Sequence, residues 1–174
     1  MSSVIGNGLA LFFVWMFAVA GIQKIRAPNY YLGLISSYMP ALPIGRFVLF
    51  ALASYELALA LCLLLPQTRA YGLMGSALLL LAYAAMMAWQ VWRGGADMDC
   101  GCSGPASELT VSPALVVRNL VCACLAVLAM FALAGVAVGV VGMVLSVVIA
   151  SFIITFYLCS DQLIANAQQM AGEV

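Results

Sequence analysis

The residues of this sequence best suited to chemistry are two cysteines separated by one glycine, Cys100-Gly101-Cys102. Cα atoms two residues apart lie about 5.5–7 Å from each other, which overlaps the range that a disulfide spans. Glycine eases the backbone into the small ring that such a disulfide would close. A ring this small should still strain the disulfide, and a strained disulfide is suited to exchange with other thiols. The ring closes almost no loop, so it would add little stability as a staple. The spacing therefore favours thiol–disulfide exchange.

A soft-metal site is the alternative use of these two thiols. Two thiolates can bind Cu(I), with methionines as further soft ligands. Structural zinc needs four ligands, and the sequence has no histidine to complete such a set. The lack of histidine also removes the commonest acid–base group and any His-based catalytic triad. We expect no resident metal, and a copper-carrying role stays open as an alternative.

Two charged residues, Glu56 and Arg118, lie inside apolar stretches of the sequence. Charges within a membrane are costly and generally face a partner or a cavity. Arg118 lies about 7 Å into the apolar stretch that follows the cysteine pair. We therefore predict that Glu56 is the ion-pair partner of Arg118, and that Arg118 stabilises a thiolate of the pair. A structural ion pair that only fixes helix packing is the alternative, and both roles can hold together.

Four further cysteines occur in apolar runs, where a free cysteine is a common packing residue. Cys122 follows Arg118 by one helical turn and shares its face, so a relay to the loop pair is conceivable. Cys159 ends an apolar run and could approach the same loop. We interpret all four mainly as packing residues: Cys62, Cys122, Cys124 and Cys159.

The composition places the chain in a lipid bilayer. Of its 174 residues, 67% are hydrophobic and 7% are charged, whereas about a quarter of the residues in soluble domains are charged. Six basic and six acidic residues cannot cover the surface of a soluble fold. A net charge of zero without a basic cluster argues against nucleic-acid binding. We predict a single integral membrane domain over residues 1–174.

Five apolar runs have about the 20 residues that a helix needs to cross the hydrocarbon core. The apolar stretch after Pro113 would be about 70 Å long as one helix, so we place a turn near residues 135–139. The predicted fold is an all-α, polytopic transmembrane helical bundle, with a four-helix core and an additional C-terminal helix. Its spans are predicted at residues 4–22, 44–65, 71–92, 113–134 and 136–158.

The connections between these spans carry most of the charge. Lys24 and Arg26 end the first span, where their side chains can extend to the interface. Residues 28–43 are rich in tyrosine and predict an interfacial loop with a short amphipathic segment. Because the first and third loops share a side and hold most of the basic residues, the positive-inside rule puts Cys100 and Cys102 in the cytoplasm. Reductants there would keep the thiols reduced.

Several landmarks, taken in order, resemble the MauE branch of the MauE/DoxX membrane proteins. They are Ala20-Gly21-Ile22-Gln23-Lys24-Ile25, Tyr38-Met39-Pro40, Glu56-Leu57, Cys100-Gly101-Cys102 and Val117-Arg118-Asn119. The resemblance implies a multi-pass protein of the bacterial inner membrane with the Cys100–Cys102 loop in the periplasm. This orientation is the opposite of the one given by the basic residues.

The resemblance also implies an accessory role in methylamine utilization. The chain would support disulfide formation in the small subunit of periplasmic methylamine dehydrogenase, and Cys100 and Cys102 would exchange with a thioredoxin-like partner, MauD. Electrons could then pass to a membrane quinone or between protein thiols only. The alternatives are a non-enzymatic membrane scaffold for subunit maturation and, as above, a soft-metal carrier of copper.

Overall fold

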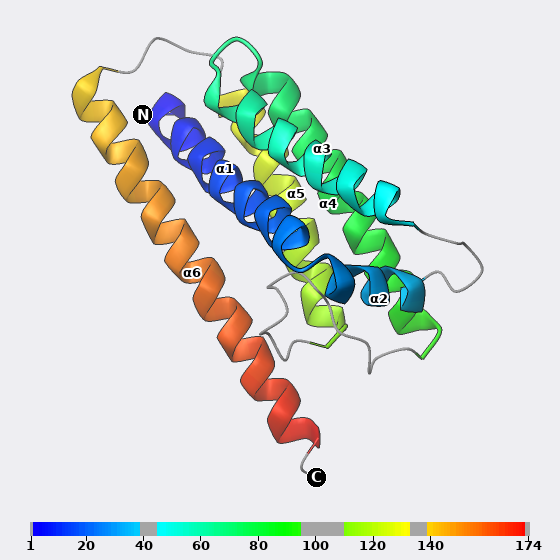
Figure 1. Ribbon diagram of the computed structural model, residues 1–174. Coiled ribbons are helices and arrows are strands. Elements are labelled where there is room, and N and C mark those ends of the chain that lie inside the picture. Colours follow the sequence, from blue (N-terminus) through cyan, green and yellow to red (C-terminus); the bar gives the residue numbers. More distant parts are fainter. Residues whose placement is uncertain (1, 39–44, 95–109, 133–138, 173–174) are drawn as a thin grey trace.

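The computed structural model describes residues 2–38, 45–94, 110–132 and 139–172, and the described part is built from six α-helices (Figure 1). The helices are α1 (Ser2–Arg26), α2 (Pro28–Tyr38), α3 (Arg46–Leu64), α4 (Arg69–Trp92), α5 (Pro113–Ala132) and α6 (Val140–Gly172). Five of them are long and apolar enough to span a membrane, and only α2 is too short. The predicted all-α, five-span membrane fold is therefore confirmed.

Helix α1 is the centre of the bundle. It packs against α3 and α5 on one side and against α6 on the other, while α4 joins α3 and α5. Three phenylalanines of α1, Phe12, Phe13 and Phe17, are almost completely buried among these helices. Because lipid tails are as apolar as these side chains, the bundle is held by close packing rather than by water exclusion.

Two glycines allow α1 to approach its neighbours closely. A Cβ atom at Gly21 would lie 2.9 Å from the Leu57 Cγ atom of α3, and one at Gly8 would lie 2.7 Å from the Ile149 Cγ2 atom of α6. Non-bonded carbon atoms do not approach each other this closely, so a side chain at either position would push the helices apart. Small residues at these two points therefore set the spacing of α1 from α3 and α6.

Helix α2 lies across the end of the bundle where α1 finishes (Figure 1). The sequence predicts an interfacial loop with a short amphipathic segment here, and the segment is an eleven-residue helix. Tyr31 does not face the headgroups as its type suggests, because only 2% of its surface is exposed. The helix thus turns one tyrosine inward and covers the bundle interior at this end.

Helix α6 is longer than predicted. Its 33 residues correspond to roughly 50 Å, and it continues well past Leu158, where the sequence predicts the end of the fifth span. It packs mainly against α1, as expected for an additional helix outside a four-helix core. Near its end, Gln168 exchanges two hydrogen bonds with the backbone of Thr110, of 3.2 and 2.9 Å. The far end of α6 is therefore tied to the residues just before α5.

Candidate functional site

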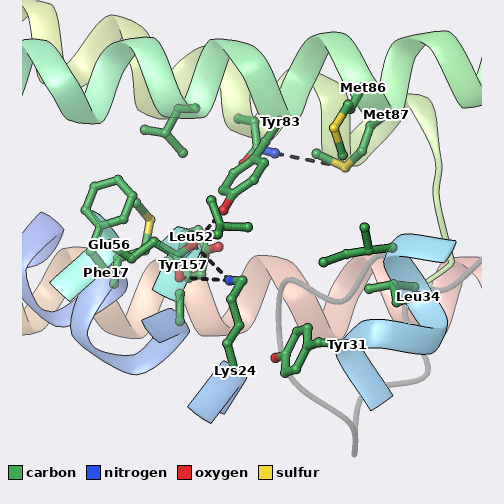
Figure 2. Close-up of a pocket in the computed structure, with 15 residues that line it drawn as sticks. Phe17, Lys24, Tyr31, Leu34, Leu52, Glu56, Tyr83, Met86, Met87 and Tyr157 are labelled. Carbon is green, nitrogen blue, oxygen red and sulfur yellow. Dashed lines mark hydrogen bonds and ion pairs between the residues drawn. The ribbon is translucent and has the colours of Figure 1, made fainter. Parts of the chain in front are cut away.

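A pocket of about 120 Å³ lies inside the bundle at the end that α2 covers, and Figure 2 shows its lining. All six helices contribute side chains to it, and most of these are aliphatic, aromatic or methionine. The lining residues are Met16, Phe17, Ala20, Lys24, Tyr31, Leu34, Ile35, Leu52, Glu56, Leu80, Tyr83, Met86, Met87, Asn119 and Tyr157. The pocket is therefore an apolar chamber with a few polar groups in its wall.

An ion pair between Lys24 of α1 and Glu56 of α3 forms the polar centre of this wall. The Lys24 Nζ atom lies 2.8 Å and 2.9 Å from the two carboxylate oxygens of Glu56. The Tyr83 hydroxyl of α4 donates a third hydrogen bond to Glu56, of 2.6 Å. Lys24 and Tyr83 reach the carboxylate from opposite sides (Figure 2). Glu56 is completely buried, and its charge is balanced by one cation and three hydrogen bonds.

Aromatic rings complete the surroundings of the Lys24 ammonium group. It lies 5.4 Å from the centre of the Tyr31 ring and 5.9 Å from that of Tyr83, within the range of cation–π attraction. Its position in the last turn of α1 also places it beside the partly negative carbonyl end of that helix. The prediction that Lys24 extends to the interface was wrong, because α2 covers it and Glu56 binds it.

A second buried ion pair joins α5 to α6. An Nη1 hydrogen bond links Arg118 to the Asp161 carboxylate, and the guanidinium carbon lies 4.8 Å from the centre of the Tyr157 ring. Both charged residues are more than nine-tenths buried. Since Tyr157 also lines the pocket, the second ion pair contacts a residue of the pocket wall.

The predicted ion pair between Glu56 and Arg118 was therefore wrong in both partners. The prediction matched the two residues by depth alone, and each pairs instead with a residue of another helix. Gly21 brings α1 against α3, so Lys24 meets Glu56. Helix α6 runs on past the end of its apolar stretch, so Asp161 meets Arg118.

Cys100 and Cys102 lie outside the described residues, in the connection from α4 to α5. The described residues on either side of this connection lie at the same end of the bundle as the pocket. Gly94 follows α4 with φ of +78°, a left-handed conformation that glycine adopts readily. Val111, before α5, is buried between Met87 and Leu115. The chain thus leaves and re-enters the bundle at the end that α2 covers (Figure 1).

The four cysteines that the structure describes are free thiols with different exposures. Cys122 is buried and Cys62 half-buried, whereas Cys124 and Cys159 are exposed on the outer surface of their helices. Cys122 lies in the main core cluster among alanines of α5, which agrees with a packing role. The described ranges hold no cluster of three metal-ligating side chains of the Cys, Asp or Glu type. A metal site centred on Cys100 and Cys102 falls outside those ranges.

Comparison with known proteins assigns the chain to a family. A family model described as "Methylamine utilisation protein MauE" matches residues 2–132. The chain belongs to the MauE family. A MauE protein of Paracoccus denitrificans, named "Methylamine utilization protein MauE", is 33% identical over 120 residues, or 68% of this chain and 64% of that protein. One of Methylophilus methylotrophus with the same name is 32% identical over 95 residues, or 53% of this chain and 50% of that protein. No solved structure matches the chain.

The match to the MauE family covers α1 to α5 and ends before α6. Lys24, Glu56, Tyr83 and Arg118 therefore lie within the matched residues, whereas Asp161 lies beyond them. The first ion pair is complete within the MauE match. The second takes its anion from the additional C-terminal helix.

Sequence reasoning about this MauE chain missed three residues of the site. Lys24 was assigned to the interface because it ends an apolar run, although it lies one turn after a glycine that permits close packing. Tyr83 carries no signal, since tyrosine is unremarkable in an apolar helix. Asp161 follows the last apolar run by two residues. A search for acidic residues at about the same membrane depth as Arg118 would have included it.

Proposed function

We propose that this MauE-family chain is a membrane accessory protein of methylamine utilization that exchanges thiols and disulfides through Cys100 and Cys102. It acts in the bacterial inner membrane with the cysteine loop in the periplasm. Its substrate there is the disulfide-rich small subunit of methylamine dehydrogenase, and its partner is a thioredoxin-like protein of the MauD type. Family membership and the names of the two relatives support the pathway.

The observation that carries the proposal is the placement of Arg118. This guanidinium lies five residues into α5, at the end of the bundle where the Cys100–Cys102 connection re-enters it. A guanidinium keeps its positive charge at any pH that the protein meets, and the hydrogen bond to Asp161 holds it in place. A thiolate formed in the connection would meet a fixed positive charge, which stabilises thiolates and activates them for exchange.

The exchange balances without a metal. A thiolate of the partner attacks one sulfur of the Cys100–Cys102 disulfide, and the other sulfur leaves as a thiolate. A second partner thiolate then attacks the mixed disulfide. The partner gains an S–S bond, and Cys100 and Cys102 gain the two electrons and two protons as a dithiol. The disulfide of another protein or a membrane quinone takes these up before the next turnover.

A trapping experiment tests the proposal. With Cys102→Ser, Cys100 can be captured in a mixed disulfide but cannot resolve it, so non-reducing gels should show an adduct with a thioredoxin-like protein. The adduct should disappear on reduction. Cys124→Ser, which changes an exposed thiol of α5, is the matched control and should give no adduct.

The scaffold alternative predicts a different result. If a Cys100→Ser, Cys102→Ser double variant gives no adduct and still supports a mature methylamine dehydrogenase small subunit, the exchange role is wrong. Copper that copurifies only when both thiols are intact, without an adduct, would support the metal carrier. A membrane-impermeant thiol reagent applied to intact cells should label Cys100 and Cys102 only after reduction. Labelling that is absent with and without reductant would place the loop in the cytoplasm.

A further inference from the structure

The pocket beneath α2 has no role in the exchange chemistry, yet it combines a defined size with polar groups aimed at its interior. Its volume is about 120 Å³. A dry cavity of roughly 150 Å³ in another protein binds one benzene ring. The chamber is slightly smaller than that cavity, a size comparable to a single six-membered ring and far below that of a whole lipid.

The Lys24 ammonium group supplies a hydrogen-bond donor at the pocket wall. An ammonium has three N–H groups, and among the described residues those of Lys24 bind the two oxygens of Glu56. One N–H is left for an acceptor in the chamber. A buried cation that is already paired can donate to a neutral carbonyl without the cost of burying a new charge.

Asn119 of α5 supplies a second donor to the same chamber. Its side-chain amide is buried and lies 4.0 Å from the Met87 sulfur, and a thioether is a weak acceptor. A carbonyl oxygen would replace the sulfur with a stronger acceptor. Lys24 and Asn119 come from different helices, so the two donors suit a ring that carries two carbonyl groups.

Five of the six helices that line the chamber are long and apolar enough to cross a membrane. Met86 of α4 lines the pocket and is also 36% exposed, and Leu52 of α3, which lines it too, is half-buried. Helix α2 covers the end of the bundle with Tyr31, Leu34 and Ile35. A ligand that reaches a chamber within these spans from the bilayer must be soluble in the hydrocarbon phase.

We propose that this pocket binds the head group of a lipid-soluble quinone, with Lys24 donating a hydrogen bond to one of its carbonyl oxygens. Its use as electron acceptor rests on the proposed function. The Cys100 and Cys102 thiols lose two electrons and two protons when their S–S bond forms, and the quinone takes up both to become a quinol. Binding itself depends only on the helices.

A fluorescence titration tests this binding. Trp15 lies 6.2 Å, ring centre to ring centre, from Tyr157 in the pocket wall, and the other two tryptophans, Trp89 and Trp92, are exposed. With those two changed to Phe, ubiquinone-1 added to protein in lipid nanodiscs should quench Trp15 fluorescence and saturate. Quenching that rises linearly without saturation would mean partition into lipid only and would overturn the proposal.

Variants in this single-tryptophan protein locate the binding. Ala20→Phe places a ring in the pocket while keeping both residues of the ion pair, and it should abolish the saturable quenching. Ala58→Phe adds the same ring on the exposed face of α3 and should leave it unchanged. Lys24→Met should weaken binding about tenfold or more, as expected for a lost hydrogen bond from a charged donor. Equal affinity in Ala20→Phe, or in a folded Lys24→Met protein, would refute the assignment.

The same titration separates this inference from the proposed function. A Cys100→Ser, Cys102→Ser variant should bind ubiquinone-1 with unchanged affinity, since the pocket contains neither thiol. Saturable binding without any mixed disulfide in the trapping experiment would refute the exchange role alone. A trapped adduct from a protein that shows no saturable binding would refute the quinone site alone.

Discussion

The buried pair of Lys24 and Glu56 gives the sharpest quantitative prediction. Glu56→Gln removes the anion while keeping the shape of the side chain, and leaves the Lys24 ammonium without a counter-charge. Breaking a buried ion pair from one side costs about 3–5 kcal/mol. We expect Glu56→Gln and Lys24→Met each to lower the free energy of unfolding by about 3 kcal/mol, which corresponds to a roughly 150-fold change in the folded-to-unfolded ratio.

The double variant distinguishes an ion pair from two independent packing effects. With both groups neutral, no unpaired charge is left inside the bundle. The loss should therefore fall short of the sum of the single losses by about 2–3 kcal/mol, in the upper range for residues in contact. The matched control is Arg26→Met, which removes an exposed charge two residues after Lys24 and should change stability by less than about 0.5 kcal/mol.

The measurement is reversible unfolding in mixed detergent micelles, with SDS as the denaturant and helix content followed by circular dichroism. The four proteins of the cycle are compared at one lipid-to-detergent ratio. If the single losses add within about 0.5 kcal/mol in the double variant, the two residues are not coupled and the pairing described above is refuted. Tyr83→Phe, which removes one of three hydrogen bonds to Glu56, should cost about 1.5–3 kcal/mol.

Two further predictions concern the attachment of α6. Gly8→Val should lower stability by about 1–3 kcal/mol, because its side chain would collide with Ile149. The same change at Gly33, which has open space around it, should leave the α1–α6 contact intact, and cysteine cross-linking between these helices compares the two; equal cross-linking in both variants would contradict the close packing. Arg118→Met should destabilise the protein by about 3 kcal/mol in the same SDS assay, and adding Asp161→Asn should restore part of the loss. If the double variant loses as much free energy of unfolding as the two single variants together, or more, the result would argue against this pair.

The helical architecture could be predicted from the sequence because length and hydropathy decide which segments cross a membrane. Four of the five predicted spans agree with their helices to within a few residues. The fifth does not, because hydropathy falls at Cys159 while the helix continues. Asp161 is neutralised there by Arg118, and the following residues include good helix formers such as Ala165 and Gln168.

The polar site could be predicted only in part. Glu56 and Arg118 were identified correctly as buried charges, since a charge in an apolar run is conspicuous. Their partners were not, because hydropathy gives the depth of a residue and says nothing about which helices are neighbours. Which helices are neighbours is decided in part by the close packing at Gly8 and Gly21. The sequence alone does not show which helix each of these glycines contacts.

The sequence separation of the two ion pairs has a consequence for how the chain enters the membrane. Lys24 precedes Glu56 by 32 residues and Arg118 precedes Asp161 by 43. At about 5–20 residues per second, a ribosome needs roughly 2–9 s to supply the anion for Arg118. During that interval an unpaired arginine in the bilayer costs about 2.5–3.5 kcal/mol by insertion scales. Helix α5 therefore gains from staying beside the translocon until α6 emerges, so α6 completes the insertion of α5.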